Sequence, residues 1–226
     1  MKQHITFFLK YFAVIAAALL ALAGSTLAGP PLICHAVEIG TAESLPWTSS
    51  GWNLTGQESY DVTHLVADTL TLLRPNTPVL VRMETLRRAT LYAQQRTAIA
   101  KELLLRLEAR TRENPKDALA AFDFGYLAEC YKQASWLHQN TDWLKKTDGE
   151  SVVRANVATG IDGYEWVRKG IALRGSDPQM EFAAALMTTE AGSREHGQHL
   201  QKAIAGAKSD VMLARNLASR FPKNTA

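Results

Sequence analysis

The chain has 226 residues, 46% of them hydrophobic, and a formal net charge of +3. That length suffices for one domain with a buried core, at most with an arm attached. Subtracting Lys2 and Lys10, which lie in the N-terminal segment described next, leaves a charge of +1, a balance that gives no general case for nucleic acid or an anionic membrane as the partner.

Residues 1–28 have the order of a secretory signal peptide. Lys2 and Lys10 bracket a charged start, an uncharged apolar run covers residues 11–23, and small residues precede Ala28. The apolar run is shorter than the roughly 20 residues of a membrane span, so cleavage is favoured over an uncut anchor. The sequence therefore predicts an exported protein, periplasmic or secreted, that begins near Gly29 and keeps no membrane segment.

The next segment, residues 29–59, is predicted to be an irregular arm. Prolines and glycines interrupt it every few residues, and neither a helical nor a strand period survives between them. Its apolar content is too high for a disordered tail, so we expect it to lie against the rest of the protein. Trp47 and Trp52 have two interpretations: they plug the arm onto the domain, or they form an aromatic surface for a partner.

Charge is distributed unevenly after the signal peptide. Residues 29–73 carry −5 with no lysine or arginine, whereas residues 74–116 carry +6, from ten basic and four acidic residues. Three interpretations are open. The acidic arm lies on the basic helices, or the acidic and basic segments form two separate solvated faces. In the third, Arg82, Arg87 and Arg88 belong to a surface for an external anionic partner. Exposed ion pairs contribute only about 0–1 kcal/mol each, so charge alone does not choose between these interpretations.

Residues 60–222 are predicted to form a helical domain. Apolar residues recur at steps of three and four, the spacing of one helical face, in three successive segments. These segments are residues 62–73, 79–90 and 99–107. Pro75 and Pro78 end the first of the three helices.

A fourth helix and an insertion are predicted next. Pro115 is expected to open a helix that reaches Leu137, because proline in a first turn sacrifices no hydrogen bond. Residues 139–160 are polar and break the helical rhythm, so we expect a long loop there.

The last third of the chain contains a faint internal repeat. A shift of 33 residues lays residues 167–177 on residues 200–210, with five of eleven positions identical. The identical pairs are Lys169/Lys202, Ile171/Ile204, Ala172/Ala205, Ser176/Ser209 and Asp177/Asp210. Periods of this length are typical of stacked helix pairs, and coincidence is the other explanation of so short a match.

This region resembles the tetratricopeptide family. Residues 169–178 are similar to that family's second helix and exit turn, with Gly170 and Ala203 at the small positions where neighbouring helices approach closely. The first-helix pattern of leucine, a small residue and an aromatic residue occurs at Leu217, Ala218 and Phe221 and at Leu127, Ala128 and Tyr131.

The resemblance covers roughly residues 115–221 and departs from the family in places. Gly175 and Lys208 stand where the family has its closing proline, the insertion interrupts the array, and no polar capping helix follows Phe221. The resemblance implies a right-handed stack of antiparallel helix pairs with a protein-binding or peptide-binding surface. Fold analogy does not by itself establish that use.

The two cysteines, Cys34 in the arm and Cys130 in the fourth predicted helix, are expected to pair as a disulfide in an oxidising compartment. Such a bond would close a loop of about a hundred residues, which is worth about 4.7 kcal/mol in the chain-entropy model. The alternative is that Cys130, which lies on the apolar face of its helix, is an ordinary buried thiol.

Motifs with a defined chemistry are few. No nucleophile-elbow, zinc-protease or phosphate-loop motif occurs, so no cofactor and no catalytic residue are predicted. His196 and His199 lie three residues apart beside Glu195 and are weak candidates for metal ligands. A metal site needs a third ligand, so a solvated polar face is the favoured interpretation of this pair.

The sequence thus predicts an exported all-α protein of stacked antiparallel helix pairs with an irregular arm, which binds or scaffolds a protein or peptide partner. The alternative is an extracytoplasmic hydrolase or metal-dependent enzyme. Its site would be assembled from His35, His64, His138 or His196 together with acidic residues and the arm. A binding protein predicts scattered histidines, whereas an enzyme predicts at least three ionisable groups in one pocket.

Overall fold

The structure, a computed structural model, describes residues 29–48, 54, 56–94, 96–139, 158–189 and 194–222. Within these residues every regular element is a helix, so the predicted all-α class is confirmed. The helices are η1 (Val62–His64), α2 (Leu65–Leu72), α3 (Val79–Ala93), α4 (Thr97–Glu113), α5 (Ala118–Gln139), α7 (Gly163–Arg174), α8 (Pro178–Met187), α9 (Arg194–Gly206) and α10 (Val211–Arg220). The predicted signal peptide, Trp52 and most of the predicted insertion lie outside the described residues.

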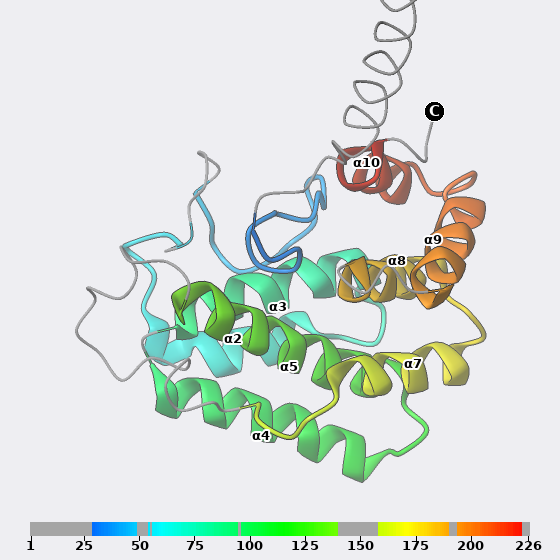
Figure 1. The fold of residues 1–226 in the computed structure, drawn as a ribbon. Helices are drawn as coiled ribbons and strands as arrows, with labels where there is room; N and C mark the ends of the chain where they lie inside the picture. Colours follow the sequence, from blue (N-terminus) through cyan, green and yellow to red (C-terminus); the bar gives the residue numbers. More distant parts are fainter. Residues whose placement is uncertain are drawn as a thin grey trace, which may run out of the picture.

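The second half of the domain consists of stacked helix pairs. α5 makes its most extensive packing with α7, and α8 with α9. Figure 1 shows α7 below α8, and α10 at the upper end of the stack. α5 also packs against α3 and α4, which connects the pairs to the first half of the domain. Phe122, Tyr126 and Tyr131 of α5 are buried at the centre of the core.

α5 and α7 approach each other backbone to backbone. A Cβ atom at Gly125 would collide with the carbonyl oxygen of Gly163, and a Cβ atom at Gly163 would collide with that of Gly125. At Gly170 a Cβ atom would lie 2.8 Å from the carbonyl oxygen of Ala118. These three glycines therefore allow an approach that other residues would block. Gly170 is one of the small positions expected from the sequence, and Ala203, the other, is also buried.

The 33-residue repeat coincides with the turns that follow the second helix of each pair. Residues 167–177 end α7 and lead into α8, and residues 200–210 end α9 and lead into α10. Asp177 caps α8 by accepting hydrogen bonds from the backbone N–H groups of Gln179 and Met180. Asp210 caps α10 in the same way through Leu213. The shared Ser-Asp pair thus marks the same position, the start of a new helix, in both copies.

The start of α5 differs from the prediction. Pro115 lies in a turn, and the helix begins at Ala118. Asp117 is the residue that fixes this start, because its Oδ1 accepts hydrogen bonds from the N–H groups of Leu119 (2.9 Å) and Ala120 (3.0 Å). The first N–H groups of a helix have no partner within the helix, and a proline side chain cannot accept their hydrogen bonds. The Asp117 carboxylate accepts two of them, so the helix begins directly after Asp117.

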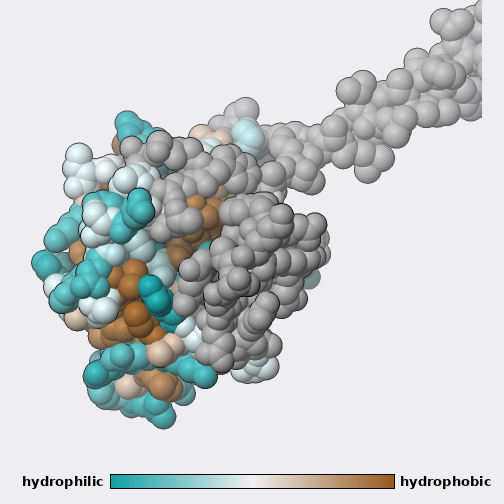
Figure 2. Space-filling view, turned by 90° about the vertical axis from the view of Figure 1, so that its left-hand side faces the viewer, coloured by the Kyte–Doolittle hydropathy of each residue, from teal (hydrophilic) through white to brown (hydrophobic). Residues whose placement is uncertain are grey.

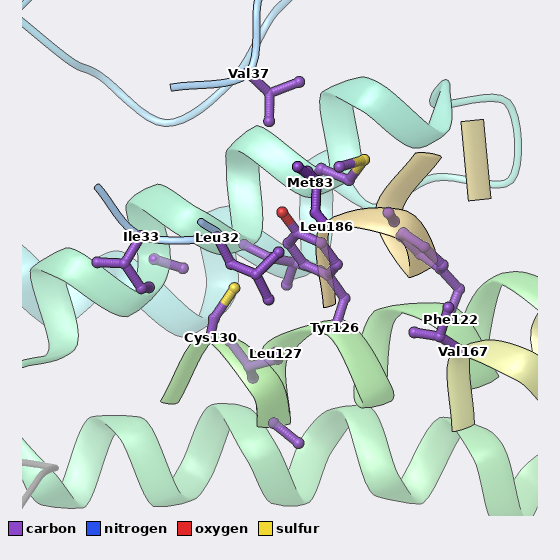
Figure 3. Close-up of a cluster of buried hydrophobic side chains, with 14 of the residues drawn as sticks. Leu32, Ile33, Val37, Met83, Phe122, Tyr126, Leu127, Cys130, Val167 and Leu186 are labelled. Carbon is purple, nitrogen blue, oxygen red and sulfur yellow. The ribbon is translucent and has the colours of Figure 1, made fainter. Parts of the chain in front are cut away.

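The arm contains no helix or strand in its described part, residues 29–48, 54 and 56–59. It packs on the helices through apolar side chains: Leu32, Ile33, Val37 and Leu45 are all buried. Figure 3 shows the first three in one cluster with side chains of α3, α5 and α8. The arm is therefore part of the core and not a solvated tail.

Figure 2 shows the side of the molecule that lies to the left in Figure 1, where hydrophobic residues appear in patches beside hydrophilic ones. Among the helices of the described residues, none is both long and apolar enough to cross a membrane.

Candidate functional site

An open cleft of about 440 Å³ lies where α7 faces α9. Because α7 closes one helix pair and α9 closes the next, the cleft lies at the junction of the two pairs. Its walls are Tyr164, Arg168, Ile171 and Ala172 of α7, Gly175 and Ser176 of the following turn, and Glu195, Gln198, His199 and Lys202 of α9. Most of the lining side chains are therefore charged or polar, and Ile171 and Ala172 are its apolar side chains.

A hydrogen-bonded line of ionisable side chains runs from the core into this cleft. Glu181 of α8 is fully buried, and its Oε2 accepts a hydrogen bond from Nδ1 of His199. Nε2 of His199 lies 2.8 Å from the Tyr164 hydroxyl, which lines the cleft. Which of the two atoms donates this hydrogen bond depends on the protons that the ring carries. The Tyr164 hydroxyl thus joins His199 to the wall of the cleft.

Glu181 is also the anchor of two further side chains. Its Oε1 accepts hydrogen bonds from Nζ of Lys202 (2.9 Å) and from the Ser176 hydroxyl (2.5 Å). Burial by itself would raise the pKa of the Glu181 carboxyl, but the hydrogen bonds from Ser176, His199 and Lys202 outweigh burial and hold the pKa below its ordinary value. One buried carboxylate therefore fixes α9 and the turn after α7 on α8.

The rim of the cleft carries both signs of charge. Arg168 bonds Glu165 at 2.6 Å, and its guanidinium carbon lies 5.8 Å from the centre of the Tyr164 ring. Glu195 and Lys202 extend from the opposite wall. Burial raises the pKa of the Tyr164 phenol, with the Glu195 carboxylate contributing, so this hydroxyl stays protonated at neutral pH.

The two histidines proposed as weak metal candidates do not share a site. His199 bonds Glu181 and Tyr164, whereas Nδ1 of His196 lies 3.0 Å from the carbonyl oxygen of Ala185. In the part of the chain that the structure describes, no three His, Cys, Asp or Glu side chains are grouped as metal ligands.

The histidines of the enzyme hypothesis lie on separate elements. His64, at the end of η1, is exposed beside Asp61, at 3.7 Å. The carbonyl oxygen of His35 accepts from Arg220, and His196 lies on α9. The side chain of His138 is outside the described residues. The ionisable groups that do converge around His199 are Tyr164, Glu181 and Lys202. The sequence analysis did not single out Tyr164 or Glu181, and it noted Lys202 only as a position of the repeat.

The three arginines expected on a partner surface, Arg82, Arg87 and Arg88, are largely covered by the rest of the chain. Arg82 is fully buried and bonds Asp123 at 2.6 Å, and Arg87 is buried against Glu84. Arg88 is mostly covered, since it bonds Glu84 and the carbonyl oxygen of Leu45. These arginines are therefore taken up by contacts within the chain and do not face an external partner.

Trp47 packs on α3. Its ring lies edge-on to Tyr92, with centroids 5.5 Å apart, and the Arg87 guanidinium carbon lies 5.1 Å from its centre. The side chain is half-buried. This placement favours its interpretation as a plug for the arm over a free aromatic surface. Trp52 lies outside the described residues.

The expected disulfide is not formed, because Cys34 and Cys130 are both free thiols. Leu32 and Ile33 enter the core ahead of Cys34, which is left half-buried in the turn that follows Pro30. Cys130 is completely buried in α5, and burial raises its pKa well above the ordinary value. Cys130 is therefore an ordinary buried thiol, the second of the two interpretations that the sequence allowed.

No family model, no curated protein and no solved structure matches this chain.

Proposed function

We propose that this chain is an exported helical binding or scaffold protein, and that the cleft between α7 and α9 binds a segment of a protein or peptide partner. The observation that carries the proposal is the composition of the cleft. Donors and acceptors of both charges line it together with Ile171 and Ala172, at the junction of two helix pairs. A polypeptide segment offers the same mixture of apolar side chains, donors and acceptors. A single small anion does not.

The side chains of the cleft are held in place before any ligand arrives. Lys202 and His199 are bonded to the buried Glu181, and Tyr164 is bonded to His199. Side chains that are already ordered lose less conformational entropy on binding, which increases the affinity that each contact provides. The tetratricopeptide resemblance supports the same use by family habit, and the stacking of α5/α7 and α8/α9 agrees with it.

A selection experiment tests this proposal. The purified chain is immobilised, a phage-displayed library of random 12-residue peptides is selected on it, and enriched peptides are synthesised and titrated by fluorescence anisotropy. Arg168→Glu reverses a charge on the rim, and Gln198→Trp fills the cleft. We expect each variant to weaken the enriched peptides by at least about tenfold, the equivalent of about 1.4 kcal/mol.

Two matched variants serve as controls. Lys169→Glu makes the same charge reversal on α7, and Gln201→Trp the same enlargement on α9, at exposed positions outside the cleft. Both should bind the peptides as the unmodified chain does. Enriched peptides that bind equally to all four variants would place the binding surface elsewhere.

A second function is favoured by one observation, the line from Glu181 through His199 to Tyr164. Three ionisable groups that hydrogen-bond in series and end at a cleft are the usual arrangement for proton transfer. The second candidate function is therefore that of a hydrolase, in which Tyr164 exchanges a proton with the substrate. Turnover of a panel of nitrophenyl esters that is lost in Tyr164→Phe and kept in Tyr60→Phe would support it, and no turnover above buffer would contradict it.

A further inference from the structure

A second pocket lies where the arm meets the end of α3. Its volume is about 290 Å³. Residues of the arm and of η1 line it from one part of the chain, and Leu91, Tyr92 and two residues of the turn that leads to α4 line it from another. The pocket shares no lining residue with the cleft between α7 and α9, so the two are separate sites.

Two tyrosine rings belong to the apolar part of this pocket. Tyr60 and Tyr92 line it with ring centroids 4.6 Å apart. Leu54 and Leu91, which are 6% and 3% exposed, line it as well. Aromatic side chains pair with further aromatic rings in stacked or edge-to-face arrangements. The apolar part of the pocket therefore favours a ligand with a planar ring.

Hydrogen bonds hold both tyrosines in place. The Tyr92 hydroxyl donates to the carbonyl oxygen of Pro46 (2.5 Å) and accepts from the N–H group of Gln57 (2.9 Å). The Tyr60 hydroxyl donates to the Asp68 carboxylate at 2.7 Å. A ligand does not have to order these rings, which lowers the entropic cost of binding.

The pocket also carries one unpaired charge of each sign. The Glu58 carboxylate and the Arg96 guanidinium both line it, and both side chains are exposed. Within the described residues, neither side chain makes an ion pair or a hydrogen bond. An exposed charge alone would indicate nothing, because water satisfies it. Here both charges border the same aromatic pocket, where a guanidinium can bind a carboxylate with two hydrogen bonds and a carboxylate can bind an ammonium group.

We propose that this pocket binds a small aromatic zwitterion, the chemistry of a free aromatic amino acid. The ring lies against Tyr60 and Tyr92, the carboxylate pairs with Arg96, and the ammonium group pairs with Glu58. The volume is at the lower end of those that hold small molecules, which favours a single amino acid over a peptide segment. This site is independent of the peptide-binding function proposed for the cleft.

Calorimetric titration of the complete chain tests the proposal with four probes. L-Phenylalanine has all three groups, whereas phenylpropionate lacks the ammonium group, phenethylamine lacks the carboxylate and L-alanine lacks the ring. We expect L-phenylalanine to bind with a dissociation constant below about 1 mM. Each of the other three should bind at least about tenfold more weakly. Equal binding of the four probes would overturn the proposal, and so would the absence of saturable binding of L-phenylalanine, L-tyrosine and L-tryptophan.

Two variants of the chain test which residue binds which charge. Arg96→Gln should weaken L-phenylalanine and phenylpropionate by at least about tenfold and leave phenethylamine unchanged, because phenethylamine has no carboxylate. Glu58→Gln should weaken L-phenylalanine and phenethylamine and leave phenylpropionate unchanged. A general loss of folding does not give this crossed pattern. If either variant weakened all the probes equally, or none of them, the assigned contacts would be wrong.

Three further variants serve as controls. Arg106→Gln and Glu113→Gln make the same changes at exposed positions of α4 outside the pocket. Arg168→Glu changes the rim of the α7–α9 cleft. All three should bind L-phenylalanine as the unmodified chain does. If Arg168→Glu weakened this binding and Arg96→Gln did not, the amino acid would bind in the cleft, and the proposal for this pocket would be wrong.

Discussion

Among the described residues, several buried charged side chains hold a distant part of the chain. Glu84 and Arg220 hold the arm, and Glu181 holds α9 and the turn after α7. Asp123 of α5 holds Arg82 of α3 and, at 3.5 Å, Arg110 of α4. Because a buried charge without a partner is costly, each of these groups specifies a contact more strongly than an apolar residue would.

Glu181→Gln should destabilise the protein. The amide keeps one acceptor but places N–H groups against the donors of His199 or Lys202, and an unsatisfied buried group costs about 1–3 kcal/mol. Urea unfolding of the variant measures this loss. Glu195→Gln, at an exposed position on α9, should change the free energy of unfolding by less than about 0.5 kcal/mol.

The same carboxyl group predicts a loss of stability in acid. The pKa of Glu181 is lowered in the folded protein, so its contribution is present above the ordinary carboxyl value of 4.5 and is lost as the pH falls through the folded pKa. Unfolding at a series of pH values should show this loss in the unmodified chain and a flatter dependence in Glu181→Gln. Parallel curves would show that Glu181 is not the group responsible.

Asp123 should change the pH dependence of stability in the opposite direction to Glu181. Burial raises its pKa to about 6 although Arg82 and Arg110 oppose the shift, and no partner for its Oδ1 is found among the described residues. A raised carboxyl pKa stabilises the folded state most below the ordinary value of 3.8, and this stabilisation is lost as the pH rises to about 6. Asp123→Asn should remove that part of the pH dependence, which NMR titration of the carboxyl carbon checks directly.

At the scale of elements, the approach of α5 to α7 depends on glycine. Gly125→Ala or Gly163→Ala should push the two backbones apart and lower the free energy of unfolding by about 1–3 kcal/mol, the usual cost of overpacking. Gly197→Ala on α9 is the control, since a Cβ atom there meets no other atom. This variant should be more stable by about 0.5–1 kcal/mol, because alanine favours helix. Thermal unfolding of the three variants should separate them by sign.

The first helices were predictable from sequence because their apolar spacing is local. α3 begins at the predicted residue, Val79, whereas α4 (Thr97–Glu113) extends beyond the predicted residues 99–107 at both ends. The start of α5 was not predicted correctly. Pro115 and Asp117 are both typical of a helix start, and the helix begins after Asp117 because the Asp117 side chain caps it. In the cleft, His199 was noticed only for its distance from His196. Its real partners, Glu181 and Tyr164, are 18 and 35 residues away, so only the packing of α7, α8 and α9 brings them together.

At the scale of the whole molecule, the charge asymmetry along the chain has a different meaning from the one expected. The arm does lie on α3, but in its described part the ion pairs of its carboxylates are exposed and lie elsewhere. Glu43 pairs with Arg74 of the loop before α3 at 3.9 Å, and Glu38 pairs with Arg215 of α10 at 3.0 Å. The buried arginines bind backbone carbonyls instead. High salt should therefore leave the arm in place, because buried hydrogen bonds are screened much less than surface charges.

Export with cleavage of residues 1–28 is a prediction about the whole molecule, and a measurement of the intact mass tests it. If residues 1–28 form a cleaved signal peptide, protein recovered from the extracytoplasmic fraction should have the intact mass of a chain that begins at Gly29. A full-length chain recovered from the cytoplasm would contradict this.

The central claim is that the cleft between α7 and α9 is where this protein binds its partner. Hydrogen exchange of the complete chain, measured with and without a peptide enriched by selection, tests it most directly. The account predicts slower exchange in residues 164–176 and 195–202, with residues 31–38 unchanged. Protection confined to other helices, or to the arm, would contradict it.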